Sequence, residues 1–289
     1  MILPAVRVYA IANERRGENT FLNILFTIDR NYIAQMLACV SSITRFPTPG
    51  GYDIYLLHSS LSEADRETIR AQEREGVCRF HFAAVETSAF DGFPETDRYP
   101  KEMYYRILAA DDLPEQLERI LYLDPDIVVI KPLDELYQSD FADNLFLATT
   151  HVSAFLTRMN ARRLKLEEPV PYVNTGVMLL NLPAMRQAVR LADIRAFVAA
   201  HGSAMTLPDQ DVVTALYGKR VRLVDDMIYN LSDRMLGFYN ARHPEDWRGL
   251  DWVRENTVII HYCGANKPWK EHYHGVLDCF YNELVQPEQ

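Results

Sequence analysis

Two aspartates with a single residue between them, Asp124 and Asp126, stand out in the segment LYLDPDIVVIKP, residues 121–132. They follow an apolar run typical of a buried strand, and no lysine or arginine adjoins them. Carboxylates this close repel each other unless a positive charge lies nearby. One interpretation is an ordinary Asp-Pro turn at a strand end. The other interpretation is a site for a divalent cation, which would in turn bind a diphosphate.

His261 is the candidate for a third ligand. It ends the apolar run TVIIHY and is followed by Cys263, Gly264 and Lys267. Carboxylate oxygens suit Mg²⁺ or Mn²⁺, and an added imidazole favours Mn²⁺. A histidine that closes an apolar strand is more commonly a core residue, so the spacing alone leaves both interpretations open.

Short apolar runs that predict strands alternate with segments whose apolar residues recur at helical spacing. This alternation predicts an α/β fold with a mostly parallel sheet flanked by helices, and the absence of an obvious linker predicts a single domain over residues 1–289. Ligands of such sheets bind beyond the carboxyl ends of the strands. The expected strands are residues 21–28, 52–58, 78–85, 119–130 interrupted by Pro125, 144–150, 172–182 and 257–262.

Composition and hydrophobicity argue against a nucleic-acid partner and against a membrane-spanning protein. A formal net charge of −10 and a pI near 5.3 argue against a nucleic-acid partner, because phosphate binding needs clustered lysine and arginine. No run is long enough to span a bilayer, and residues 1–20 contain no signal-peptide apolar region, so we expect a cytoplasmic protein. The four cysteines form no C-x-x-C pair, which predicts reduced thiols.

Six ordered segments resemble motifs of glycosyltransferase family 8, which includes bacterial lipooligosaccharide galactosyltransferases and proteins like general stress protein A. The resemblance covers roughly residues 23–269 and leaves 1–20 and 270–289 as unassigned extensions. It implies a GT-A fold, a UDP-hexose donor carrying glucose or galactose, Mn²⁺ and retention of the anomeric configuration. The segments are FTIDRNY, MYYRILAADDLP, ILYLDPDIVVIKPLDELY, VNTGVMLLNL, PDQDVV and IHYCGANKPW.

The resemblance also implies roles for individual residues on the donor side. Asp124, Asp126 and His261 become the ligands of the metal, which is Mn²⁺ with Mg²⁺ as the alternative. Arg106 is expected to reach the sugar hydroxyls or the diphosphate, although an arginine on a helix is most often solvated. The residues expected to receive uridine are Thr27 through its backbone, Asp29, Asn31 and Tyr32.

Asn174, Asp209 and Gln210 are expected to face the transferred hexose, with a helix N-cap as the alternative for Asp209. Gly264 and Lys267 are expected to close over the diphosphate, where the ammonium would stabilise the leaving UDP. The alternative for Lys267 is an exposed loop residue that serves solubility alone.

The resemblance places Gln210 where a double displacement would need a carboxylate nucleophile, so we favour front-face attack. The expected acceptor is a glycan, a lipid-linked acceptor or another molecule with a free hydroxyl, and a weak oligomer is left open. The rival hypotheses are a metal-dependent UDP-sugar hydrolase or nucleotidyltransferase, and a non-catalytic nucleotide-sugar-binding protein. The basic cluster Arg158, Arg162, Arg163 and Lys165 is interpreted as a solvated helix face, with contact to an acidic glycan as the alternative.

Overall fold

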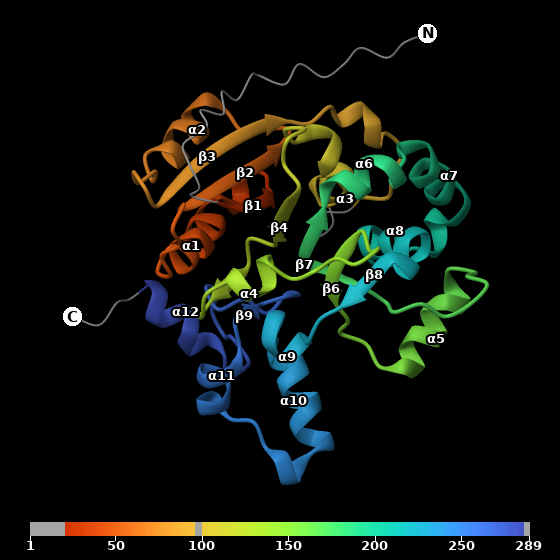
Figure 1. Ribbon diagram of the computed structural model, residues 1–289. Coiled ribbons are helices and arrows are strands. Elements are labelled where there is room, and N and C mark those ends of the chain that lie inside the picture. The colour runs from red at the N-terminus through yellow and green to blue at the C-terminus, as the bar shows by residue number, and fades with distance from the viewer. Residues whose placement is uncertain (1–20, 96–99, 286–289) are drawn as a thin grey trace.

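A seven-stranded sheet forms the centre of the computed structural model, which describes residues 21–95 and 100–285 (Figure 1). Its strand order is β3-β2-β1-β4-β7-β6-β8. The strands are β1 (Leu22–Thr27), β2 (Tyr52–His58), β3 (Cys78–Ala84), β4 (Arg119–Leu123), β6 (Phe146–Thr149), β7 (Asn174–Asn181) and β8 (Val221–Leu223).

The sheet is mostly parallel, as the alternating pattern predicted. Strands β3, β2, β1 and β4 are parallel, β7 lies antiparallel between β4 and β6, and β8 is parallel to β6. The chain order reverses between β1 and β4, because β2 and β3 lie on one side of β1 and β4 on the other. Ligands bind at such a switch point. Asp124 follows the end of β4 at this point, and Asp29 follows the end of β1.

Helices cover both faces of the sheet, which explains why the strands are apolar on both sides. Within β4, Ile120 and Tyr122 face one core and Leu121 and Leu123 face the other. The helices on the first face are α3 (Glu102–Asp112), α6 (Leu182–Ala188), α7 (Leu191–His201) and α8 (Pro208–Tyr217). Those on the second are α1 (Ile33–Ile43), α2 (Glu63–Arg70) and α4 (Asp134–Tyr137).

The strand expected over residues 119–130 is in fact two strands in two sheets. Strand β4 ends at Leu123, and β5 (Ile127–Val129) pairs antiparallel with β9 (Ile259–His261) in a separate two-stranded sheet. Pro125 lies between β4 and β5 and has no N–H to donate to a ladder. Because Ile127 lies opposite His261, this small sheet carries the histidine to the aspartates.

The C-terminal part packs around β5 and β9, below the main sheet in Figure 1. It contains α9 (Asp226–Tyr229), α10 (Asp233–Arg242), α11 (Leu250–Asn256) and α12 (Asp278–Val285), while α5 (Ala154–Arg163) follows β6. The expected unassigned extension 270–289 therefore contributes a packed helix, in which Phe280 is buried. The other expected extension, residues 1–20, lies outside the described residues.

Two further expectations concern bilayers and cysteines. In the part of the chain that the structure describes, no helix is both long and apolar enough to cross a membrane. The four cysteines are all free thiols, as their spacing predicted.

Candidate active site

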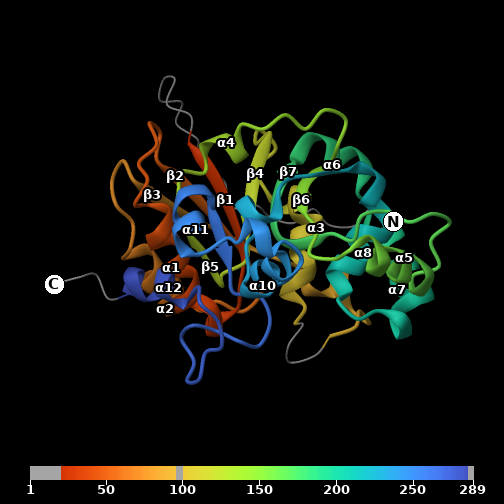
Figure 2. The same cartoon turned by 90° about the horizontal axis from the view of Figure 1, so that it is seen from below.

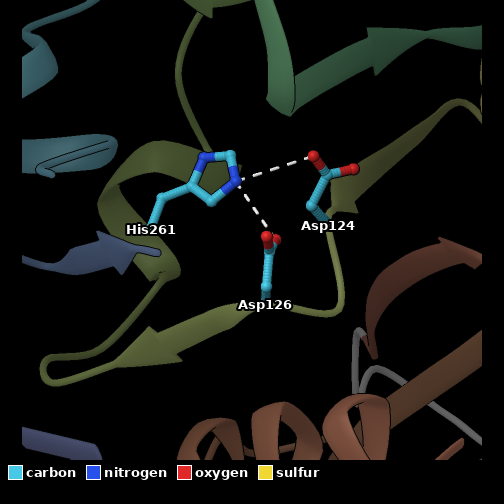
Figure 3. Close-up of side chains that lie close together, drawn as sticks. All are labelled: Asp124, Asp126 and His261. Atoms are coloured by element: carbon cyan, nitrogen blue, oxygen red, sulfur yellow. Dashed lines mark ion pairs between the residues drawn. The ribbon is translucent and has the colours of Figure 1, made fainter. Parts of the chain in front are cut away.

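Asp124, Asp126 and His261 lie together beyond the end of β4 (Figure 3). The His261 Nε2 atom is 3.1 Å from Oδ1 of Asp126 and 3.6 Å from Oδ2 of Asp124. One ligand atom from each residue falls within 4.8 Å of the others. The structure thus brings together the three residues predicted to hold a metal, from two different sheets.

Asn230 sets the orientation of the His261 ring. The Asn230 amide nitrogen donates to Oγ1 of Thr149 at 2.7 Å and to Oδ1 of Asn174 at 2.9 Å. The side-chain oxygen Oδ1 of Asn230 therefore accepts from Nδ1 of His261 at 2.8 Å. With the hydrogen on Nδ1, the neutral ring turns the lone pair of Nε2 toward the two carboxylates. This is the orientation that a metal-binding histidine requires.

Asp126 also offers a free acceptor. Its Oδ1 atom is buried and has no hydrogen-bond partner among the described residues. Buried carboxylate oxygens are normally paired, so an atom of this kind indicates a binding site. Two carboxylates and one imidazole nitrogen fit a divalent cation such as Mn²⁺ or Mg²⁺.

The positive charges near the aspartates come from residues distant in sequence. Arg106 Nη1 donates to Oδ1 of Asp124 at 2.8 Å, and the Lys267 ammonium forms an ion pair with Asp126. Both cations are buried, so the solvated interpretation of Arg106 and the exposed-loop interpretation of Lys267 are wrong. Neither ion pair could be predicted from neighbouring residues in the sequence. Arg106 in α3 and Lys267 in the loop after β9 approach the two aspartates only in the folded chain.

Charge compensation keeps these groups ionised. Burial favours a raised pKa for Asp126, but His261, in the form that carries a proton on both ring nitrogens, and the Lys267 ammonium outweigh it and hold that pKa well below its usual range. Burial similarly opposes the charge on Arg106, yet Asp124, Tyr122 and Asp209 together raise its pKa above the usual range. The site therefore combines fixed carboxylates with fixed cations.

Gly176 is a site residue that the sequence interpretation did not single out, although it lies in the motif VNTGV. A Cβ atom at this position would lie 2.2 Å from Cε1 of His261 and 2.8 Å from Oδ2 of Asp124. A side chain there would clash with two of the three candidate ligands. The absence of a side chain at Gly176 allows His261 and Asp124 to approach the backbone closely.

The residues expected to receive uridine lie at the end of β1. Asp29 caps the short 3₁₀ helix Arg30–Tyr32 and accepts from the backbone and side-chain nitrogens of Asn31, both at 2.9 Å. Thr27, Asp29 and Tyr32 line the cavity of the site, and Tyr32 is 39% exposed. Asn31 turns its side chain to Asp29 and is not among the residues that line this cavity. Its structural role is therefore to hold Asp29.

The residues expected to face the hexose line the same cavity. Asn174 accepts from the backbone N–H of Gly176 at 3.0 Å. Asp209 accepts from the Thr175 hydroxyl at 2.6 Å, and the N-cap of α8 is Leu207, so the capping alternative is wrong. Gln210 is half-buried. Gly264 also lines the cavity, and its φ of 94° is a conformation that favours glycine.

The three candidate metal ligands, the two buried cations and the residues expected to face the hexose line one cavity of about 1310 Å³. It extends from Thr27 and Tyr32, past the two aspartates, to Trp247 in the C-terminal part. His151 also lines it and was missed by sequence interpretation, since a lone histidine after a strand carries no signal of its own. Its Nε2 donates to the backbone carbonyl of Asn230 at 2.8 Å, and burial lowers its pKa to about 3. His151 is therefore neutral and helps to fix Asn230.

Comparisons with known proteins agree with this geometry. The sequence profile of glycosyl transferase family 8 matches residues 23–272. An Escherichia coli lipopolysaccharide 1,2-glucosyltransferase is 23% identical over 88% of this chain and 75% of its own length. General stress protein A of Bacillus subtilis is 21% identical over 87% of this chain and 88% of its own length.

Solved structures show the same arrangement of helices and strands. The galactosyltransferase LgtC, in complex with donor and acceptor sugar analogues, superposes with a TM-score of 0.77 at 26% identity. The match covers 91% of this chain and 95% of that one. The fold is therefore of the GT-A type. Since the family profile spans most of the sequence, the chain belongs to glycosyltransferase family 8.

Proposed function

We propose that this protein is a retaining hexosyltransferase that moves glucose or galactose from a UDP-hexose to a hydroxyl group of a glycan or lipid-linked glycan. Relatives include enzymes named lipopolysaccharide 1,2-glucosyltransferase and lipopolysaccharide 1,3-galactosyltransferase, which favours a hexose donor. The observation that carries the proposal is the orientation of His261. Its Nε2 lone pair converges with the unpartnered Oδ1 of Asp126 beside Asp124.

Asp124, Asp126 and His261 would hold Mn²⁺, with Mg²⁺ as the alternative. The bound cation would supply positive charge to the diphosphate of the donor. At the end of β1, Asp29 would accept from the uracil imide and Tyr32 would offer its ring to the base. Stacking of a base on an aromatic ring contributes about 1–3 kcal/mol in proteins that bind nucleic acids.

Two buried cations extend the positive field toward the leaving group. The Lys267 ammonium is held between Asp126 and the Tyr262 carbonyl, to which it donates at 2.8 Å. Arg106 is held by Asp124 and by the Thr175 carbonyl, at 3.0 Å. Groups that are already oriented stabilise developing charge without reorganisation. Lys267 is therefore proposed to act on the departing UDP, and Arg106 to fix Asp124.

Retention itself is proposed from the family, and the availability of a carboxylate nucleophile decides between double displacement and front-face attack. Asp209 and Asp211 flank Gln210 in sequence. Asp211 is buried and bonded to Arg163 and Tyr172. Asp209 is also buried, bonded to Thr175 and 3.6 Å from Arg106. Burial raises its pKa, against the opposing effect of Arg106. A carboxylate held in this way is a poor nucleophile for the anomeric carbon.

We therefore favour front-face attack. The bond from the anomeric carbon to the diphosphate breaks, and the acceptor oxygen bonds to the same face of that carbon. The acceptor proton passes to the departing phosphate oxygen. Gln210 would stabilise positive charge on the sugar through its amide oxygen.

The test is incubation of the pure protein with UDP-glucose or UDP-galactose and Mn²⁺, with and without glycan acceptors. Chromatography and mass spectrometry would identify the products. We expect UDP release to depend on acceptor and a hexose to appear on the acceptor. Formation of UMP and hexose phosphate would instead identify a hydrolase, and tight UDP-hexose binding without turnover a binding protein.

A further inference from the structure

Helix α5 leaves three large apolar side chains in solvent. Phe155 is 62% exposed, Leu156 43% and Met159 50%. They lie within five residues of one another, so they form one patch on the helix surface. Of the residues in α5, only Ala161 is buried. A short helix that turns its apolar side chains outward indicates an interaction surface.

The same segment carries exposed cations. Arg158 and Arg162 in the helix and Lys165 just after it are exposed, and none of them forms an ion pair with a described residue. Residues 151–166 contain no aspartate or glutamate, in a chain whose formal net charge is −10. The α5 patch, defined as Phe155, Leu156, Met159, Arg158 and Arg162, is therefore both apolar and basic.

The fourth basic residue of this segment has a different role. Arg163 donates to both carboxylate oxygens of the buried Asp211, at 2.6 and 2.8 Å, and Leu164 is buried next to it. These contacts attach the C-terminal end of α5 to the protein body. The helix thus has a fixed orientation, with the α5 patch directed away from the core.

We propose that the α5 patch docks onto an anionic lipid surface. Apolar side chains flanked by arginine suit the boundary between acidic headgroups and acyl chains. A second copy of the chain fits less well, because a two-fold contact through α5 would place the cations of one patch against those of the other. The acidic remainder of the protein would be repelled by such a surface, which leaves α5 as the point of contact.

The position of α5 connects docking to the site. Val152, just before the helix, and Asn160 within it line the active-site cavity. A protein docked through the α5 patch would hold its cavity near the lipid headgroups, within reach of a lipid-linked acceptor. This consequence rests on the proposed function, whereas lipid binding itself does not.

Flotation with vesicles tests the docking directly. The native protein should bind vesicles of phosphatidylcholine mixed with phosphatidylglycerol, bind pure phosphatidylcholine weakly, and be released by salt. Arg158→Glu with Phe155→Ser should lower the partition coefficient at least about tenfold. The matched control is Arg45→Glu with Val285→Ser, both exposed. Val285 ends α12 and the charge of Arg45 acts on Glu283 of that helix, which lies on the opposite side from α5 in Figures 1 and 2. The control should bind like the native protein.

Several results would overturn the proposal. These are equal partition of the α5 variant and the native protein, no preference for phosphatidylglycerol, or a concentration-dependent dimer in sedimentation that the α5 substitutions abolish. Circular dichroism and Mn²⁺-UDP affinity, both expected to be unchanged, would show that the α5 variant is folded. Because vesicle binding requires no turnover, its failure would leave the proposed hexosyl transfer standing.

Discussion

Gly176 and His261 lie so close that a methyl group on the glycine would come within 2.2 Å of the imidazole carbon Cε1. The ring has little freedom to retreat, because it is buried and bonded to Asn230. Strand β7 therefore presses directly against a candidate metal ligand, and the space at Gly176 determines where that ligand stands.

Gly176→Ala should weaken Mn²⁺-dependent UDP binding by at least about tenfold, because the methyl group displaces His261 and Asp124. Titration calorimetry of UDP in the presence of Mn²⁺ measures this. Gly202→Ala is the matched control, since Gly202 does not line the cavity and a Cβ atom there would meet only Cγ of Pro94, at an ordinary contact distance of 3.5 Å. Unchanged affinity in Gly176→Ala would contradict the metal assignment.

Asn230→Ala should lower Mn²⁺ affinity by roughly 10-fold to 100-fold, because the His261 ring loses the acceptor that orients it. Asn240→Ala removes another buried asparagine. Its Nδ2 donates to the backbone carbonyl of Arg248 and its Oδ1 accepts from the backbone N–H of Arg248, both at 2.9 Å. That variant should lose stability but keep its Mn²⁺ affinity. Equal losses of affinity in both variants would mean that Asn230 acts through general stability alone.

Gln210→Ala should slow transfer by roughly 100-fold without abolishing it, since an amide that only stabilises charge supplies part of the barrier. Rates of hexose transfer and of UDP-hexose binding are measured separately, with exposed Gln72→Ala as the control. The product from an α-linked donor should be an α-glycoside, readable from the coupling of the anomeric proton by NMR. An inactive variant with sugar trapped on the protein would instead support double displacement, and a β-linked product would overturn retention.

Acidification should destabilise the protein through His58. Burial lowers the pKa of this histidine from 6.5 to about 4, so it is neutral when folded and takes up a proton on unfolding below its ordinary pKa. The stability it contributes is present at neutral pH and is lost as pH falls from about 6.5 toward 4.

Denaturant titrations from about pH 6.5 to about pH 5 test this prediction. The free energy of unfolding should depend on pH less steeply in His58→Gln than in the native protein, by about 1 kcal/mol per pH unit. The same substitution at exposed His243 should leave the slope as it is. Identical slopes for His58→Gln and the native protein would show that His58 does not titrate on unfolding.

Much of the fold could be predicted from local patterns. Apolar runs bounded by polar residues identified every strand of the main sheet except the three-residue β8, which no such run marks. The break at Pro125 was visible, but not its consequence, because a sequence does not state which strands pair. The pairing of β5 with β9 joins segments more than a hundred residues apart.

The sequence by itself determined the candidate ligands. Asp124, Asp126 and His261 are recognisable because oxygen and imidazole ligands have a characteristic chemistry and because the surrounding motifs resemble a known family. Tertiary structure decided what surrounds them. Lys267 is the cation of Asp126 although 141 residues separate them, and Gly176 leaves the space that His261 and Asp124 occupy. Charge pairing and close packing depend on distances in space, which chain folding creates and residue order does not state.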